Sequence, residues 1–189
     1  AHAEDVPTPT PIPTPKAAPM AATAMPIPKA PEVAARGYIL EDFHSAQVLA
    51  ESNADERLEP ASITKVMASY VIFKELAAGK IKLDDMVTIS ERAWRMEGSR
   101  MFVEVGKQIP VQDLLIGMIV QSGNDATVAL AEHVAGTEEA FAEYMNKYAQ
   151  ELGMTGSHFA DASGMPHPEH YMTARDIAIM ARALISEFP

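Results

Sequence analysis

The sequence predicts a mixed α/β fold in which a short antiparallel β-hairpin precedes a series of helices. Two apolar segments flank a polar turn near residue 40, which is typical of a hairpin. Apolar residues then recur at helical spacing over most of residues 60–189, and a proline-rich composition marks only the first thirty-odd residues. We therefore expect one globular part, residues 36–189, behind a separate N-terminal stretch, residues 1–35.

The composition excludes several classes of function. The chain has 189 residues, 48% of them hydrophobic and 22% charged, with a formal net charge of -11 and no cysteine. A strongly acidic chain repels phosphate backbones, so we expect no nucleic-acid partner. Without cysteine, disulfides, thiolate-bound zinc and thiol catalysis are impossible. No uninterrupted apolar run approaches the ~20 residues that a membrane-spanning helix needs.

The N-terminal stretch reads as a linker. Nine of the 14 prolines lie between Pro7 and Pro31, spaced mainly by Thr, Ala and Ile. Such a segment lacks backbone donors and a burial pattern, so we expect a disordered, extended chain of polyproline character. Ala1-His2-Ala3 has the small-x-small form that precedes signal-peptidase cleavage. Residues 1–35 therefore predict a cleavage remnant and linker of an exported, periplasmic or cell-surface protein.

The hairpin is expected from residues 37–40 and 47–50, around a turn at 41–45. Further short extended pieces are expected around 87–89 and 101–103, and after Val105 nothing is typical of a strand. A two-stranded hairpin is marginal alone. Either the helices cover it unaided or the strands that complete its sheet lie beyond Pro189, and we favour truncation at that end.

Five helices are expected from apolar periodicity and end signals. They lie between Pro60 and Gly79, from Val111 to Ile119, from a cap at Asn124 or Asp125 to Gly136, from Thr137 to Gly153, and from Thr173 through Ile185. Glycine at the end of three of them suits a left-handed C-cap. Thr173 with Asp176 three residues later resembles a capping box.

The first chemical motif is Ser62-Ile63-Thr64-Lys65 at the start of the first long helix. Residues three apart share one helix face, so the Lys65 amine can hydrogen-bond the Ser62 hydroxyl. Serine is a weak nucleophile until a neighbouring base takes its proton, and a partly buried lysine with a lowered pKa can do so. The helix N-terminus adds a field that favours a developing oxyanion.

The second motif is Ser122-Gly123-Asn124 in the connection between two apolar helices. Such a loop can project a hydroxyl as a second proton carrier and an amide that both donates and accepts hydrogen bonds. Each motif alone is also typical of an ordinary helix N-terminus or turn. Together, about sixty residues apart in a chain with export features, they match the signature of β-lactamases and penicillin-binding proteins, except for a Lys-Thr-Gly motif.

On these motifs the chain resembles the low-molecular-mass penicillin-binding proteins, the serine-type D-alanyl-D-alanine carboxypeptidases. The resemblance runs from about residue 36 to the end and rests on RGYILED, ERLEPASITKVMASYV, EGSRMFVEVG, LLIGMIVQSGNDATVALAEHVAG and LGMTGSHFADASGMPHPEHYMTARDIAIMARALI. It implies an antiparallel sheet flanked by helices, in which the first hairpin pairs with strands from the far end of the domain, plus an all-helical subdomain facing the cleft.

The resemblance also implies residue roles. Ser62 would attack the D-Ala-D-Ala carbonyl of a peptidoglycan stem peptide, and Lys65 would act as its base. Ser122 would relay a proton to the leaving D-alanine, and Asn124 would hold the acyl-side amide. The Ser62 backbone N–H would form half of the oxyanion hole. β-Lactams would acylate the same serine, and neither a metal nor an organic cofactor is implied.

One family motif is missing. Lys-Thr-Gly should bind the substrate carboxylate and complete the oxyanion hole, whereas Met154-Thr155-Gly156 lacks the cation and comes too soon after Asn124. We therefore expect residues 36–189 to be the N-terminal part of a longer catalytic domain. Losing an oxyanion donor costs roughly 10²–10³ in rate, so we expect little turnover from this part alone. A peripheral membrane attachment would lie outside it.

Two alternative functions stay open. A serine β-lactamase shares the Ser62–Lys65 motif, but Gly123 stands where the class A pattern has Asp. An exported scaffold that binds cell-wall peptides without catalysis would equally lack Lys-Thr-Gly. A metal site could be drawn from His158, Asp161, His167 and His170, but Pro168 interrupts the helical spacing that such ligands use, so a polar surface loop is the better interpretation.

Overall fold

The computed structural model describes residues 33–189, and the predicted cleavage remnant and linker lie almost entirely outside that range. The elements are β1 (Tyr38–Glu41), β2 (Val48–Ser52), a 3₁₀ turn (Ala61–Ile63), α1 (Thr64–Ala77), β3 (Met86–Thr88), α2 (Glu91–Trp94), β4 (Gln108–Pro110), α3 (Val111–Val120), α4 (Asn124–Ala135), α5 (Glu138–Leu152) and α6 (Ala174–Glu187). The predicted order of one hairpin followed by five long helices is confirmed.

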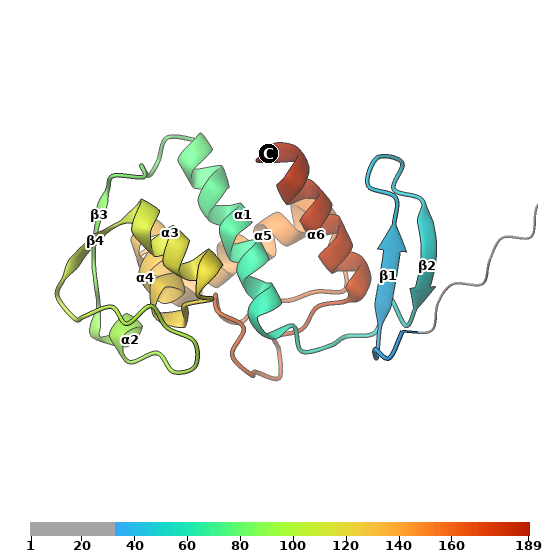
Figure 1. Cartoon of the computed structure of the whole chain (residues 1–189), viewed down its shortest axis with the longest axis horizontal. Helices are drawn as coiled ribbons and strands as arrows, with labels where there is room; N and C mark the ends of the chain where they lie inside the picture. The colour runs from blue at the N-terminus through green and yellow to red at the C-terminus, as the bar shows by residue number, and fades with distance from the viewer. Residues whose placement is uncertain (1–32) are drawn as a thin grey trace, which may run out of the picture. The chain divides into compact units, whose positions relative to one another are not determined.

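Helix α1 lies at the centre of the helical part, with α3, α4, α5 and α6 around it (Figure 1). Met67, Ala68, Val71 and Ile72 of α1 are fully buried, and α4 is buried along most of its length. The methionines that fall on helical faces, such as Met67, Met118, Met145 and Met180, fill this core. Because α1 is enclosed on several sides, its N-terminal turn is held rigidly for the site described below.

Strands β1 and β2 form an antiparallel pair that lies beside α6 (Figure 1). Tyr38 pairs with Ser52, and a register shift follows Leu40. Neither strand contains a fully buried residue, and Leu40 and Leu49 are both more than half exposed. Within residues 33–189 this sheet has only two strands.

The second strand pair corrects the sequence analysis. β3 pairs with β4 in antiparallel register, so the expectation that no strand follows Val105 was wrong. The extended piece expected at 101–103 is a loop, and the short helix α2 was not expected. A three-residue strand is too short for a period-two pattern to stand out. In this structure, the burial of Val87 and the contact of β3 with α4 stabilise the β3–β4 pair.

The helix caps divide into expected and unexpected ones. Thr173 accepts a hydrogen bond from the Asp176 N–H (3.1 Å) and Thr137 accepts one from the Ala140 N–H (3.1 Å), as their positions predict. The cap expected at Asn124 or Asp125 was wrong. Gly123 is the N-cap residue of α4, and the two polar side chains that follow it face a neighbouring loop instead.

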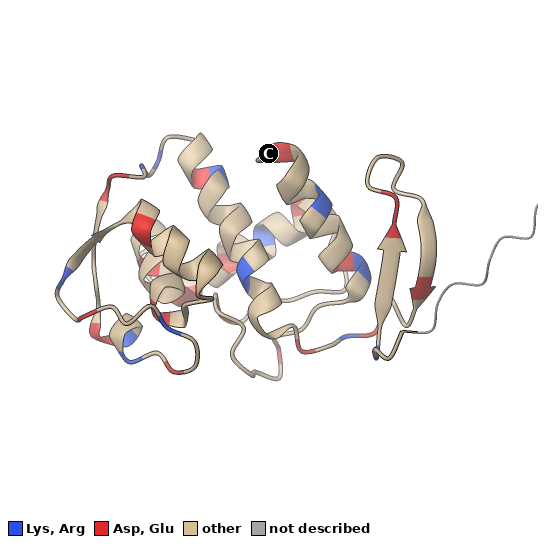
Figure 2. Ribbon diagram, in the orientation of Figure 1, with Lys and Arg blue, Asp and Glu red and all other residues tan. Residues whose placement is uncertain are grey.

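Acidic and basic residues are scattered over the described helices, strands and loops (Figure 2). Several pair across elements: Arg182 of α6 with Glu41 of β1 (2.9 Å), and Arg92 of α2 with Glu138 of α5 (2.7 Å). In both pairs the glutamate is largely buried and the arginine is partly exposed. In residues 33–189, no helix combines the length and the apolar character needed to cross a membrane.

Candidate active site

The site begins at the turn that leads into α1. Ser62 lies in the 3₁₀ turn, is exposed, and follows Ala61, whose φ of 47° is left-handed. A non-glycine residue held there costs on the order of 1–3 kcal/mol, and such strain is concentrated at functional sites. The turn continues directly into α1, so Ser62 stands at the N-terminal end of a long buried helix.

Lys65 lies one turn further along and is only 6% exposed. Its Nζ donates to the Ser62 hydroxyl oxygen (3.0 Å) and to the Ser163 carbonyl oxygen (2.9 Å). Burial lowers the pKa of Lys65 from 10.5 to about 8, against the opposing effect of the Asp161 carboxylate. The lysine therefore combines contact with a nucleophile and a pKa from which it can take up a proton near neutral pH.

Ser62, Lys65 and Ser122 line one cavity of about 250 Å³. Its walls are mainly apolar and come from α1, α3 and α6; they include Val66, Phe73, Met118, Ile119 and Leu184. Ser122 has a φ of 55°, the second left-handed non-glycine residue at this site. The structure thus brings the two predicted serine motifs together. A larger hollow of about 510 Å³ lies beside Arg57 and Tyr171 and includes none of these three residues.

Asn124 is the fourth predicted site residue, and it is buried at the first position of α4. Its Nδ2 donates to the Glu97 carbonyl oxygen (2.7 Å), and its backbone N–H donates to the Ser99 carbonyl oxygen (2.7 Å). Its Oδ1 has no hydrogen-bond partner among the described residues. A buried acceptor without a partner is costly unless a ligand supplies the donor, which suits an amide N–H.

A loop that sequence reasoning did not assign to the site completes it. Residues 161–165 place the Ser163 carbonyl on Lys65, and Gly164 lies against the turn that carries Ser62. Gly164 has a φ of 89°, and a Cβ there would stand 1.9 Å from the Ala61 carbonyl oxygen. Only glycine fits that approach. The Asp161-x-Ser163-Gly164 sequence is a local turn signal, but nothing in it predicts contact with a residue a hundred positions earlier.

The histidine-rich loop differs from expectation at one position. His167 and Glu169 are exposed, as a polar surface loop implies, whereas His170 is buried and contacts Thr64 and Asp161. Within residues 33–189, no three His, Asp or Glu side chains are grouped so that they could hold a metal ion. Met154-Thr155-Gly156 lies after α5, where Gly156 donates its N–H to Asp176 (2.9 Å).

The fold and the site define a class of protein: a mixed α/β protein in which a serine at a helix start contacts a buried lysine. The chain belongs to the peptidase family S11, described as D-alanyl-D-alanine carboxypeptidase, whose family model matches residues 24–189. The family resemblance and the fold class drawn from the sequence are therefore confirmed.

Individual relatives agree with that family. The chain is 49% identical over 178 residues to the D-alanyl-D-alanine carboxypeptidase DacC of Escherichia coli (strain K12), which covers 91% of this chain and 44% of that protein. It is 43% identical over 151 residues to DacF of Bacillus subtilis (strain 168), with 80% and 39% covered. Penicillin binding protein 5 from Haemophilus influenzae superposes with a TM-score of 0.83 at 45% identity, covering 85% of this chain and 47% of that one. The chain thus spans less than half the length of these relatives.

Proposed function

We propose that this chain carries the nucleophile and base of a serine-type D-alanyl-D-alanine carboxypeptidase. Its substrate is the D-Ala-D-Ala end of peptidoglycan stem peptides, and β-lactams acylate the same serine. The observation that carries the proposal is the 3.0 Å contact between Lys65 Nζ and Ser62 Oγ inside a mainly apolar cavity. Membership of a family described by that activity supports it.

In the acylation step, Lys65 in its neutral form takes the proton from the Ser62 hydroxyl as Oγ attacks the carbonyl carbon of the penultimate D-alanine. The carbonyl oxygen becomes negative at the N-terminal end of α1, where the Ser62 backbone N–H and the positive end of the helix dipole stabilise that charge. The C–N bond to the terminal D-alanine then breaks. An acyl-enzyme ester forms on Ser62, and water hydrolyses it in a second step.

Ser122 and Asn124 serve the leaving group and the acyl group. The Ser122 hydroxyl borders the same cavity as Lys65, so it can pass a proton from the lysine to the departing amine. The unpartnered Oδ1 of Asn124 can accept the N–H of the acyl-side amide. Both roles use hydrogen-bonding capacity that the described residues leave open.

The proposed substrate determines the cellular compartment in which the protein acts. A peptidoglycan hydrolase must act outside the cytoplasmic membrane, so we infer an exported protein, in accord with the small-x-small sequence at residues 1–3. Periplasmic residence with peripheral attachment to the inner membrane belongs to the same proposal.

The proposal is tested by the intact mass of the full-length gene product after incubation with a penicillin. A covalent adduct should form on the wild type and be absent from Ser62→Ala. Ser186→Ala is the matched control, because it removes an exposed hydroxyl on α6. D-Alanine release from a D-Ala-D-Ala peptide is then measured on the same three proteins and should follow the adduct.

Other outcomes distinguish the alternatives. Rapid loss of the adduct with penicillin hydrolysis and no D-alanine release would identify a serine β-lactamase. A folded full-length protein that gives neither adduct nor D-alanine would refute the proposed enzymatic function and favour a scaffold that binds cell-wall peptides.

A further inference from the structure

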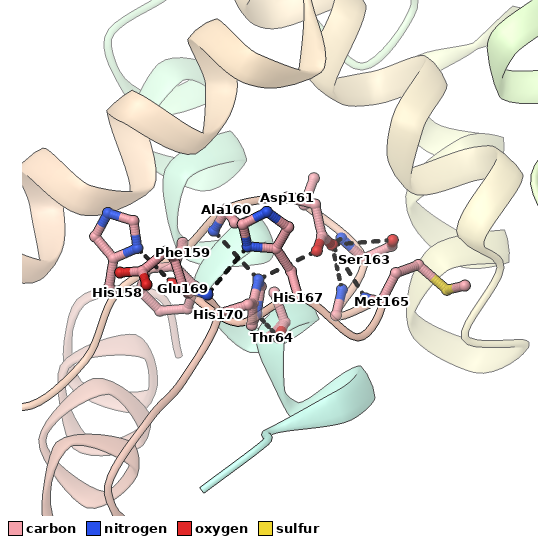
Figure 3. Close-up of polar contacts among 12 residues, drawn as sticks. Thr64, His158, Phe159, Ala160, Asp161, Ser163, Met165, His167, Glu169 and His170 are labelled. Carbon is pink, nitrogen blue, oxygen red and sulfur yellow. Dashed lines mark hydrogen bonds and ion pairs between the residues drawn. The ribbon is translucent and has the colours of Figure 1, made fainter. Parts of the chain in front are cut away.

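The loop that contacts Lys65 is held by a hydrogen-bond network that the proposed reaction does not use (Figure 3). Its members are Asp161, His170 and Thr64, from the loop, the segment before α6 and the first position of α1. His170 and Thr64 are buried, and the Asp161 side chain is 17% exposed. Polar groups in such surroundings are costly unless each has a partner, so the arrangement is closely specified.

Asp161 organises the loop itself. One carboxylate oxygen, Oδ1, accepts from the backbone N–H groups of Ser163 (2.8 Å), Gly164 (2.6 Å) and Met165 (3.2 Å), and from the Ser163 hydroxyl (3.2 Å). Burial would raise the pKa of Asp161, but the His170 contact and these N–H groups outweigh it and lower the pKa to about 2. The carboxylate is therefore ionised at neutral pH.

His170 joins the loop to α1. Its Nδ1 lies 3.2 Å from Asp161 Oδ2, and its Nε2 lies 2.8 Å from Thr64 Oγ1. The Ala160 backbone nitrogen also lies 3.2 Å from Nδ1. A ring nitrogen that donates a hydrogen bond to Asp161 cannot also accept one from Ala160. We assign the Nδ1 proton to Asp161, because an unprotonated nitrogen would place its lone pair against a carboxylate. In the neutral ring, Nε2 then accepts from the Thr64 hydroxyl.

This network determines where the hydrogen-bond acceptor of Lys65 lies. The Ser163 carbonyl that it positions accepts one Lys65 N–H (2.9 Å), and the adjacent Gly164 packs on the turn that carries Ser62. A neutral amine has two N–H bonds and one lone pair. With one N–H fixed on Ser163, the amine can turn its lone pair to the Ser62 hydroxyl 3.0 Å away.

We propose that Asp161 and His170 are positioning residues for acylation: they hold the Ser163 carbonyl on Lys65 and so orient the amine toward Ser62. The inference rests on the proposed function and names two residues that act on it without touching the substrate. A displacement of 1 Å at a reacting group can cost roughly a hundredfold in rate, so a loop that anchors the base is a sensitive point.

The charged groups around Lys65 are few. Asp161 faces it from the loop with His170 behind, and its charge raises the pKa of Lys65 against the larger opposing effect of burial. From α5, Glu138 accepts the Ala162 N–H (3.2 Å) and pairs with Arg92 (2.7 Å). Removing the Asp161 charge should therefore lower the pKa of Lys65 further.

The experiment compares acylation rates by a fluorescent penicillin across pH in the full-length protein. Asp161→Asn and His170→Ala should acylate roughly 10–100-fold more slowly. His170→Gln should recover most of the rate, because its amide can donate to Asp161 and accept from Thr64. The acid limb of the Asp161→Asn profile should move to lower pH. Glu169→Gln is the matched control, since it removes an exposed carboxylate from the same segment.

Wild-type rates in both Asp161→Asn and His170→Ala would overturn the proposal. So would a loss that merely follows the folded fraction, measured by thermal unfolding, with the acid limb unmoved. An NMR titration of Lys65 Nζ in Asp161→Asn needs no β-lactam, so it tests the charge effect even if no adduct forms. Absence of a Ser62-dependent adduct in the wild type refutes the proposed function, whereas an adduct that forms at wild-type rate in Asp161→Asn and His170→Ala refutes this inference.

Discussion

At the scale of single residues, the site depends on how one lysine is buried. Burial disfavours the ammonium form of Lys65 and lowers its pKa, and the Asp161 carboxylate opposes part of that effect. With a pKa of about 8, roughly a tenth of the lysines are neutral at pH 7, against fewer than about one in a thousand at the ordinary value. That difference separates a usable base from an inert one.

The first prediction concerns the pH dependence of this group. The pKa of Lys65 is lowered, so the neutral, competent form accumulates as pH rises, and the acylation rate should climb from pH 6 and level off above about 8. Lys65→Arg should remove the rise and lower the rate by at least about a hundredfold, because a guanidinium stays protonated. Stopped-flow acylation with a fluorescent penicillin measures both.

Lys74→Arg provides the control for that variant, because Lys74 lies on the same helix, is partly exposed and pairs with Glu187. Its rate and profile should match the wild type. An acylation rate that stayed flat between pH 6 and 9 in the wild type would contradict the assignment of Lys65 as the base.

The sequence predicted these residues unequally. Ser62 and Lys65 are three positions apart on one helix, so local geometry alone brings them together. Ser122 and Asn124 needed the family resemblance, since no local rule places a helix connection against α1. Asp161 and His170 were named only as members of a conceivable metal site, and their contacts near α1 were not predicted. They reach α1 through loops, and the contact between His170 and Thr64 joins residues 106 positions apart.

At the scale of elements, the start of α4 serves as an anchor for the loop that follows α2. Asp125 Oδ1 accepts from the Met101 N–H (3.0 Å) and Oδ2 from the Val103 N–H (3.1 Å). Asn124 holds the same loop through the carbonyl oxygens of Glu97 and Ser99. The expectation of a simple cap failed here because Gly123 takes the N-cap position, and these side chains bond mainly to a distant segment, although Asp125 also accepts from the Ala126 N–H of α4 (2.8 Å).

The second prediction tests that anchor. Asp125→Ala should lower the free energy of unfolding by about 2–4 kcal/mol, because it leaves the Met101 and Val103 N–H groups without their acceptor. Urea denaturation measures the loss. Asp84→Ala, at an exposed position, should change stability by less than about 0.5 kcal/mol. Equal effects of the two substitutions would show that the loop does not depend on α4.

Element types were more predictable than element partners. The five long helices follow from apolar spacing and from end signals such as the left-handed Gly153. The Thr173 cap follows from its own sequence in the same way. Strand β4 and helix α2 have three and four residues, too few for any periodicity to stand out, and only tertiary contacts stabilise them.

At the scale of the whole described region, burial is uneven. The side chains of α1 and α4 form the centre of the core, and the β3–β4 pair contributes the buried Val87. The β1–β2 pair contributes no buried residue, and its contacts with α6 include the ion pair of Arg182 with Glu41. Local stability follows buried apolar contact, so these three regions should open with different free energies.

Hydrogen exchange of the 189-residue chain, followed by mass spectrometry of peptides, should resolve these three levels. Amides of 64–77 and 126–134 should exchange most slowly, because they open only when the core does. Amides of β3 and β4 should be intermediate, and those of 38–52 fastest, since a two-stranded pair without buried side chains is marginal in water. Arg182→Gln should speed exchange in 38–41 while leaving α1 unchanged. If 38–52 were protected as strongly as α1, the hairpin and the helices would open as one cooperative unit, and the ranking by burial would be wrong.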